Sequence, residues 1–380
     1  MKFAKLIRRN LFRNKLRAIL TMLLLAVIFF FVATLLAILE NFENFSNAGE
    51  GANRLVVQSA ISLATLLPYA HEQKIRDIPG VVDTAKLQWI GAYYKEKSNF
   101  FANFAVDVNK MPTVFDDYKI DPKDMAAFAA DRRGALVGKD LMKRFGWKVG
   151  DRVTLKRQIF PFDPELTIRG TYEHPVQTTS LFFPMEYFEH AVGDRSEVGT
   201  FWVKVKDPKQ MSVISQQIDA MFKNSDYPTE TFTEKEFQAN FLSMMGNVKL
   251  LFTAVSSCAI FMVILLAAIT MSMSARERVT EIAVLKAIGF EQRLVLGLML
   301  TEFILLTVIG GAAGSYGAHY LYSVVDMGKV TQGFLQNFAI HTKTLMICLA
   351  SSAGVGLIAG GLPALRASNL RVVDGLRRVV

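Results

Sequence analysis

Four long apolar stretches dominate the pattern of hydrophobic and polar positions. Three carry no charged residue, and the remaining one, the third, carries only Glu302. An apolar stretch of about 20 residues is long enough to cross the hydrocarbon core of a bilayer as a helix. We therefore predict an α-helical membrane protein with four transmembrane helices, at residues Ala18–Leu39, Leu250–Ala275, Leu294–Val325 and Thr344–Leu365.

The first span is too long for the apolar core of about 7–15 residues that is typical of a cleaved signal peptide. Glu40 and the bulky Phe42 follow it in place of small residues that would suit cleavage. We therefore expect this span to stay in the protein as a helix. The roughly two hundred residues between the first and second spans then form one large water-exposed insert.

Lysine and arginine mark the cytoplasmic side of short loops in membrane proteins. With four spans, the N-terminal segment, the loop between the second and third spans, and the C-terminal tail all lie on one side. We expect that side to be the cytoplasm and the insert to be extracytoplasmic. The basic residues of these three segments are Lys2, Lys5, Arg8, Arg9, Arg13, Lys15 and Arg17; Arg276, Arg278, Lys286 and Arg293; and Arg366, Arg371, Arg377 and Arg378.

The net charge of +9 does not indicate a nucleic-acid surface. Residues 40–249 hold 26 Lys/Arg and 28 Asp/Glu, whereas the rest of the chain holds 17 and 6. The positive excess therefore belongs to membrane topology, and no nucleic acid is expected as a partner. The two cysteines, Cys258 and Cys348, fall in predicted spans, where we expect them to fill gaps between helices. The insert must then be held by a core without disulfides.

The insert has a mixed α and β pattern. Short segments rich in β-branched and aromatic residues predict strands, and segments with apolar residues at helical spacing predict helices. Residues Gly134–Gly138 are expected to lead into a helix. The predicted strands are one within Arg54–Ala70, then Val81–Tyr94, Phe100–Val108, Arg152–Lys156, Leu166–Tyr172 and Thr200–Val205, and the predicted helices are His71–Ile78, Lys139–Phe145 and Pro208–Phe222.

The last part of the insert, Glu234–Gly246, contains no proline and has one glycine, at its end. We expect it to continue as a helix into the second span and to form a stalk for the insert, although a loop is the alternative.

Motifs for enzymatic chemistry are missing from the sequence. Gly138-Lys139 is followed by Asp140 and lacks the first glycine of a phosphate-binding loop. The five histidines are scattered without the pairing of a zinc motif. We therefore expect no catalytic residue, no metal and no cofactor in this chain. The histidines are His71, His174, His190, His319 and His341.

Two polar residues of the third span could have a function in the membrane, because ionisable groups there are costly. Glu302 and His319 are the two. The simpler interpretation places Glu302 near the cytoplasmic boundary, where it snorkels or pairs with an arginine, and His319 near the outer end.

Small residues at spacings of four predict close helix packing in the membrane, either within one chain or with a second copy. They are Gly310, Gly314 and Ala318 in the third span, and Gly356 and Gly360 in the fourth.

The loop after the second span has the most distinctive local sequence pattern of the chain. Residues 274–290 look helical, with charges at Arg276, Glu277, Arg278 and Glu281. Gly289 suits a helix stop. Such an amphipathic helix either lies on the membrane surface, stiffens the loop, or docks into a groove of a cytosolic partner. Its apolar residues recur at every third position, at Val279, Ile282, Leu285 and Ile288.

Several segments resemble one family. The sequence RERVTEIAVLKAIGF (residues 276–290) is similar to a signature of the FtsX/MacB-type permeases of ABC transporters, the type VII exporter fold. Segments at Ile75–Val82, Ala135–Leu155 and Thr167–Glu173 resemble that family's periplasmic core domain, and the basic N-terminus and the tail at Leu362–Arg377 resemble its two ends. The N-terminal residues and the compact length also resemble the branch of cyanobacterial glycolipid exporter permeases.

The resemblance implies a non-catalytic permease subunit of the bacterial inner membrane. Such permeases form dimers, identical or not, and recruit a separate cytosolic ATPase that uses ATP and magnesium. Export proceeds by mechanotransmission, in which motion passes through the stalk to the extracytoplasmic domain, and a periplasmic adaptor is a further partner of some members. The residues implied in ATPase coupling are Arg276, Glu277, Arg278, Glu281, Leu285, Lys286 and Gly289.

Three functions are compatible with the sequence. The first is export of a hydrophobic or amphiphilic compound, a lipid or a peptide. The second is transmembrane signalling to an extracellular cell-wall hydrolase, and the third is lipoprotein extraction. The insert of about two hundred residues favours the first.

The expected layout combines these observations. A basic cytoplasmic segment precedes the first span, an extracytoplasmic α+β domain with its stalk follows it, and a coupling helix joins the second and third spans. In residue numbers the parts are 1–17, 18–39, 40–249, 250–275, 276–293, 294–325, an outer loop at 326–343, 344–365 and a cytoplasmic tail at 366–380.

Overall fold

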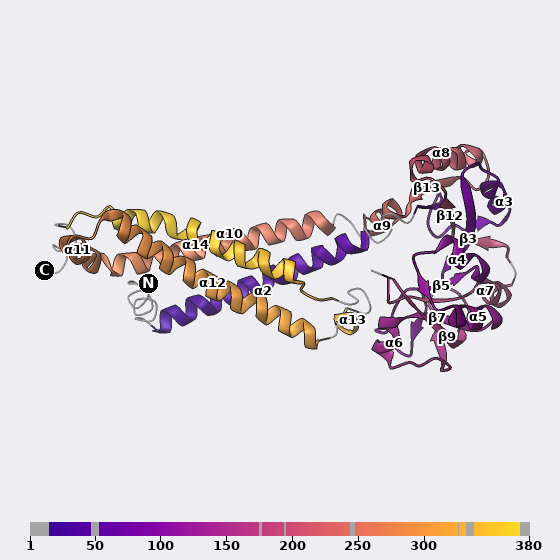
Figure 1. Ribbon diagram of the computed structural model, residues 1–380, viewed down its shortest axis with the longest axis horizontal. Helices are drawn as coiled ribbons and strands as arrows, with labels where there is room; N and C mark the ends of the chain where they lie inside the picture. The colour runs from indigo at the N-terminus through magenta and orange to yellow at the C-terminus, as the bar shows by residue number, and fades with distance from the viewer. Residues whose placement is uncertain are drawn as a thin grey trace. The chain divides into compact units, whose positions relative to one another are not determined.

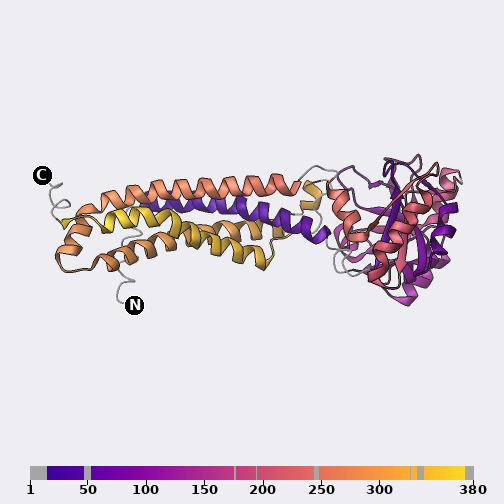
Figure 2. The same ribbon diagram turned by 90° about the horizontal axis from the view of Figure 1, so that it is seen from above.

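The computed structural model describes residues 15–46, 53–174, 177–193, 195–243, 248–325, 327–331 and 338–372. The chain divides into two compact units, each with its own hydrophobic core. The membrane unit comprises residues 1–40, 247–326 and 338–380, and the inserted domain comprises residues 41–246 and 327–337. Figures 1 and 2 show the helices of the first unit and the sheet of the second.

The membrane unit is built from long helices that run side by side in both views (Figures 1 and 2). Within the described ranges, four helices are long and apolar enough to cross a membrane. The most extensive packing joins the third and fourth of them. The helices are α2 (Lys15–Ser46), α10 (Val248–Glu277), α12 (Gln292–Val324) and α14 (Thr342–Ser368), with the short α11 (Val279–Ala287) between α10 and α12.

Glycines at the spacing of four place helix backbones in close contact within this one chain. A methyl group added to Gly314 would lie 2.1 Å from the carbonyl oxygen of Ala26 in α2. One added to Gly356 in α14 would lie 2.4 Å from Thr307 of α12. Side chains larger than hydrogen do not fit at such positions, which is how small residues bring helices together. Gly310 faces Leu25 and Gly360 faces Phe303 in the same way, and Ala318 is fully buried.

The two cysteines differ in their surroundings. Cys348 is buried between helices, as expected, but Cys258 is exposed on the surface of α10. The prediction that both fill gaps between helices is therefore wrong for Cys258. Helical periodicity could not place it, because α10 is apolar on all sides.

The inserted domain is organised around a mixed sheet. Among the described residues the sheet has 11 strands, in the order β13-β1-β12-β3-β5-β10-β7-β9-β8-β4, with β6 paired to β9. The strands β2 (Leu67–Pro68) and β11 (Glu197–Val198) form a separate pair. The sheet strands are β1 (Arg54–Ser59), β3 (Val81–Trp89), β4 (Tyr93–Tyr94), β5 (Asn103–Val106), β6 (Lys119–Ile120), β7 (Gly134–Gly138), β8 (Arg152–Lys156), β9 (Glu165–Glu173), β10 (Leu181–Pro184), β12 (Thr200–Val205) and β13 (Thr229–Thr233).

Both faces of the sheet are covered. Alternating residues of β1 show this, since Leu55 and Val57 join one core cluster and Val56 joins the other. Alternation follows from the two-residue period of a strand. The first cluster is covered by α3 (Ala70–Arg76), α6 (Lys139–Phe145), α7 (Met185–Val192) and α8 (Met211–Phe222), and the second by α4 (Met111–Val114), α5 (Pro122–Ala130) and α9 (Glu234–Ser243). Short 3₁₀ turns, η1 (Val108–Lys110) and η2 (Pro208–Gln210), precede α4 and α8, and α13 (Met327–Val330) follows α12.

Local chemistry explains several element boundaries. Helix α5 begins at Pro122 because the side chain of Asp121 accepts a hydrogen bond from the backbone N–H of Lys123. Helix α6 ends where Gly146 adopts a φ of +66°, a left-handed conformation that suits glycine. The helix predicted at Lys139–Phe145 and the strands predicted at Arg152–Lys156 and Thr200–Val205 have the observed bounds.

Other predictions for the insert need correction. The single strand expected at Val81–Tyr94 is two strands, β3 and β4, because Gly91 turns the chain with a φ of +66°. Residues Gly134–Gly138 lead into helix α6 as expected, and they form the buried strand β7, which was not predicted. The strand expected at Phe100–Val108 covers only Asn103–Val106. The uninterrupted helix from α9 into α10 involves residues 244–247, which lie outside the described residues.

Candidate functional site

The loop after the second span contains two helices and not one. The sequence predicts a continuous helical segment over residues 274–290, but α10 extends to Glu277 and α11 begins at Val279. Arg278 lies at the junction with φ −102° and ψ 10°, outside the helical region. The break lets α11 leave the direction of α10. It could not be read from the sequence, since no glycine or proline marks it.

Arg278 makes the strongest polar contact of this loop. Its guanidinium donates from Nη1 to Oε2 of Glu302 over 2.6 Å and from Nη2 to Oε1 over 2.8 Å. Both side chains are largely buried, at 13% and 8% exposure. A paired, bidentate geometry is what makes a carboxylate tolerable inside a membrane helix. The only charged residue of the third span is thus explained by pairing with an arginine, the simpler of the two interpretations.

Lys286 ties the other end of α11 to the fourth span. Its Nζ donates to the carbonyl oxygens of Ser368 and Leu370, each over 2.8 Å. These carbonyls stand at the C-terminus of α14, which has unpaired acceptors and a partial negative charge. Helix α11 is therefore fastened to α12 at its start and to α14 near its end.

The remaining residues of α11 divide into a buried and an exposed face. Val279, Ile282 and Ala283 are buried, and Ile282 joins the core of the membrane unit. Val284 is 43% exposed and Ile288 is 72% exposed. The apolar residues at every third position were expected to form one face. Only the first two of them, Val279 and Ile282, are buried. Arg276, Glu277 and Ala287 are exposed as well, whereas Glu281 and Leu285 are half-buried.

Gly289 stops α11 as its sequence position suggests. It has a φ of +101°, its N–H donates to the carbonyl of Lys286, and the next N–H, from Phe290, donates to that of Leu285. This is the glycine-terminated helix end that satisfies otherwise unpaired carbonyls. His319, the second polar residue of the third span, donates a hydrogen bond from its Nδ1 to the carbonyl oxygen of Ile340 over 2.9 Å.

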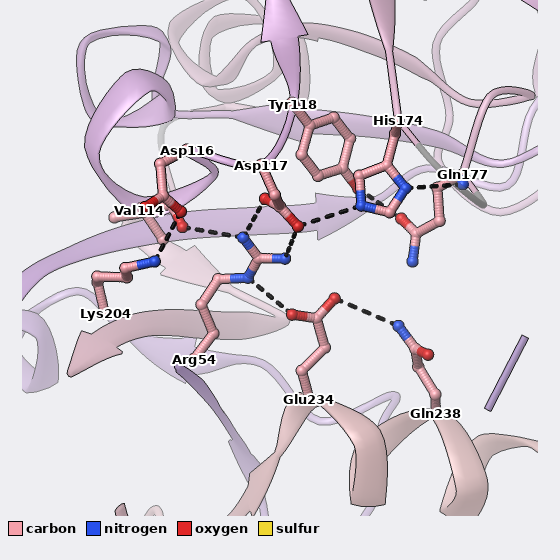
Figure 3. Close-up of polar contacts among 10 residues, drawn as sticks. All are labelled: Arg54, Val114, Asp116, Asp117, Tyr118, His174, Gln177, Lys204, Glu234 and Gln238. Carbon is pink, nitrogen blue, oxygen red and sulfur yellow. Dashed lines mark hydrogen bonds and ion pairs between the residues drawn. The ribbon is translucent and has the colours of Figure 1, made fainter. Parts of the chain in front are cut away.

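A second polar site, buried in the inserted domain, was not anticipated. Arg54, at the start of β1, is fully buried and binds two carboxylates (Figure 3). Its Nη1 and Nη2 donate to the two oxygens of Asp117, and its Nε donates to Oε2 of Glu234 over 2.7 Å. Nη1 also donates to the carbonyl of Val114. We call Arg54, Asp117, His174 and Glu234 the ion cluster.

His174 completes the ion cluster. Its Nε2 lies 3.1 Å from Oδ2 of Asp117, and its Nδ1 accepts a hydrogen bond from the backbone N–H of Gln177 over 2.9 Å. Because Nδ1 is an acceptor, Nε2 carries the proton that it donates to Asp117. Figure 3 shows the ring aimed at the carboxylate, with Tyr118 beside it.

Burial raises the pKa of each carboxylate of the ion cluster, whereas pairing with a cation lowers it. Although desolvation opposes it, hydrogen bonds from His174 and Arg54 hold the pKa of Asp117 well below its usual range. Desolvation raises the pKa of Glu234, and the pairing with Arg54 only partly counters it. Desolvation also opposes the charge of Arg54, yet its partners hold the guanidinium pKa above its usual value. Arg54 is therefore shared by two carboxylates, of which Glu234 is the weaker acid.

The members of the ion cluster are far apart in the chain, so no local motif reveals them. Arg54 and Glu234 are 180 residues apart, and Arg54 and Asp117 are 63 apart. His174 attracted no role from the sequence because it has no histidine partner. In the part of the chain that the structure describes, no group of three His, Cys, Asp or Glu side chains could hold a metal ion.

Comparison with known protein families decides the assignment. A model described as the MacB-like periplasmic core domain matches residues 18–221, and one described as the FtsX-like permease C-terminal matches residues 253–372. The chain belongs to the MacB/FtsX-type ABC transporter permeases. It is therefore a multi-pass membrane protein with an extracytoplasmic domain, and a non-catalytic subunit.

Individual relatives agree with this family. The ABC transporter permease MJ1507 of Methanocaldococcus jannaschii is 22% identical over 97% of this chain and 96% of its own length. The macrolide export ATP-binding/permease protein MacB of Neisseria meningitidis serogroup A is 26% identical over 52% of this chain, but the match spans only 30% of that protein. The cyanobacterial glycolipid exporter branch is not among these relatives.

Solved structures of extracytoplasmic regions are also similar. The periplasmic region of MacB from Actinobacillus actinomycetemcomitans aligns with 53% of this chain and 96% of its own, at 10% identity and a TM-score of 0.39. The extracellular domain of the transporter YknZ aligns with 47% of this chain and its whole length, at 11% identity and a TM-score of 0.36.

Proposed function

We propose that this permease takes energy from a separate cytosolic ATPase and passes it as motion through the membrane helices to the extracytoplasmic domain. The cargo is a hydrophobic or amphiphilic compound, a lipid or a peptide. Both termini and α11 lie in the cytoplasm in this proposal, because the basic segments cluster there. A second permease copy completes the assembly, and a periplasmic adaptor is a further partner.

The attachment of α11 is the observation that supports this proposal best. Helix α11 follows α10 in the chain, is fastened to α12 through Arg278 and Glu302, and is fastened to α14 through Lys286. A force applied to it therefore reaches three membrane helices. A flexible loop would not transmit the same force, because its backbone could change conformation at little cost in free energy and leave the membrane helices in place.

We propose two roles for the candidate coupling residues, according to their exposure. Arg276 and Glu277, which are exposed, are proposed to contact the ATPase together with the exposed Val284 and Ile288. Arg278 and Lys286 act inside the permease and transmit the movement. Glu281 and Leu285 are half-buried and are assigned to neither group. Gly289 sets the end of α11.

The test is co-purification of the tagged permease with a cytosolic ABC ATPase of the same cell, followed by measurement of hydrolysis rates. The variant Val284→Ala/Ile288→Ala should weaken the association by roughly 30-fold, because apolar anchors at an interface contribute about 2 kcal/mol. Ile358→Ala is the matched control, since this isoleucine of α14 is 63% exposed outside the loop.

Unchanged association in the α11 double variant would remove α11 as the docking helix. If no ATPase associates with the unaltered permease, the proposal of ATP-driven transport itself fails.

A further inference from the structure

We propose that Glu234 is a proton-binding residue that controls how firmly α9 is held against β1. This inference goes beyond the transport function and does not depend on it. It rests on the charge of the ion cluster, on the unequal pairing of its two carboxylates, and on the position of α9 in the chain.

The ion cluster has one cation too few. Arg54 carries one positive charge, and Asp117 and Glu234 together carry two negative charges when both are ionised. In the arrangement observed, the Nδ1 of His174 accepts the N–H of Gln177, so this ring adds no second positive charge. A net buried charge is costly, so the cluster favours uptake of one proton.

Glu234 is the carboxylate that takes this proton. Asp117 accepts hydrogen bonds from both Nη atoms of Arg54 and lies near His174, and its side chain is 28% exposed. Glu234 accepts one short bond from Arg54 and a long one of 3.3 Å from Gln238, and it is 2% exposed. The less hydrated and less well paired carboxylate is the weaker acid.

Gln238 provides a place for the added proton. Its side-chain oxygen is buried and has no hydrogen-bond partner within the described residues. A proton on Oε1 of Glu234 can be donated to that oxygen once the amide turns over. The N–H of Arg54 continues to donate to Oε2, so the neutral form loses no contact.

The other charged groups around α9 do not change this balance. Lys204 of β12 pairs with Asp116, and Glu236 of α9 accepts from the N–H and hydroxyl of Thr233. Glu230 of β13 is exposed, as is Lys235 of α9. Tyr118, beside the cluster, stays neutral because burial raises its pKa well above the ordinary value.

The ion pair between Arg54 and Glu234 joins the two ends of the inserted domain. Arg54 opens the first strand, and Glu234 opens the last helix before the second span, since α9 ends at Ser243 and α10 begins at Val248. A carboxyl with a raised pKa stabilises the fold most at low pH, and this contribution is lost as pH rises through the folded-state pKa. The attachment of α9 should therefore weaken as pH rises.

Hydrogen exchange of the full-length permease in lipid nanodiscs, without the ATPase, tests this inference. Protection factors of the α9 amides, measured from about pH 5 to pH 8 and corrected for intrinsic exchange, should fall as pH rises, by up to about tenfold per pH unit where Glu234 titrates. Glu234→Gln keeps an acceptor for Arg54 but cannot ionise, so its α9 protection should not depend on pH.

Glu230→Gln, on the exposed side of the neighbouring strand, is the control and should retain the wild-type pH profile. A wild-type α9 whose protection is constant over this range would overturn the inference, and so would a Glu234→Gln variant with the wild-type slope. Failure here leaves the ATPase test unaffected, because no ATPase is present.

Discussion

The membrane unit and the inserted domain each contain a buried arginine with carboxylate partners, but the two arrangements differ in charge balance. Arg278 has one partner, Glu302, in a bidentate pair. Arg54 has two, Asp117 and Glu234. A carboxylate that shares its arginine with a second carboxylate is less fully compensated than one with an arginine of its own. In the proposed arrangement, the attachment made through Glu234 is therefore the one that changes with pH.

Removing the shared cation should have the largest effect on stability. Arg54→Met leaves the buried Glu234 and the partly buried Asp117 without a counter-charge, so we expect unfolding of the domain to become easier by about 3–5 kcal/mol at neutral pH. The loss should be smaller at about pH 5, because both carboxyls can then take protons. Thermal unfolding of the full-length protein measures this.

Arg152→Met is the matched control, since Arg152 is exposed on β8. A loss for Arg54→Met that is no larger than for Arg152→Met would show that the ion cluster does not hold the domain together.

A smaller effect is expected where the membrane unit relies on close backbone contact and not on charge. Gly314→Ala places a methyl group 2.1 Å from the carbonyl oxygen of Ala26, so α2 and α12 must separate. We expect a loss of about 1–3 kcal/mol, the usual cost of overpacking, without dependence on pH. Denaturation of the detergent-solubilised permease provides the measurement.

Gly317→Ala is the control on the same helix, because nothing lies within 4 Å of the added methyl group. Equal stability of the two variants would contradict the close contact between α2 and α12.

The sequence predicts the membrane unit better than the inserted domain, for a physical reason. A span needs only local apolar length, so the helix ends lie within about three residues of the predicted bounds, except that α2 continues past Leu39 to Ser46. The packing glycines are also visible as a local pattern, although their partner helices are not. Pairings across a sheet depend on contacts between distant segments, so strands such as β10 and β13 and the strand order were not predicted.

The same reason explains which parts of the candidate sites were found. Residues 276–289 form a local pattern that marks α11. The break at Arg278 escapes prediction because no glycine or proline marks it and its partner Glu302 lies 24 residues away. The ion cluster escapes entirely, because its four members lie in separate parts of the chain and none carries a motif. Burial of a charge becomes visible only when the fold is known.

In the proposed function, α11 passes motion into the membrane helices through Arg278 and Glu302. The most direct test measures permease-dependent ATP hydrolysis for Arg278→Glu, Glu302→Arg and the double charge reversal. Each single reversal places like charges together and should abolish coupling while the ATPase still co-purifies, and the double reversal should restore coupling at least in part. Single variants that hydrolyse ATP at the wild-type, permease-dependent rate would contradict the account.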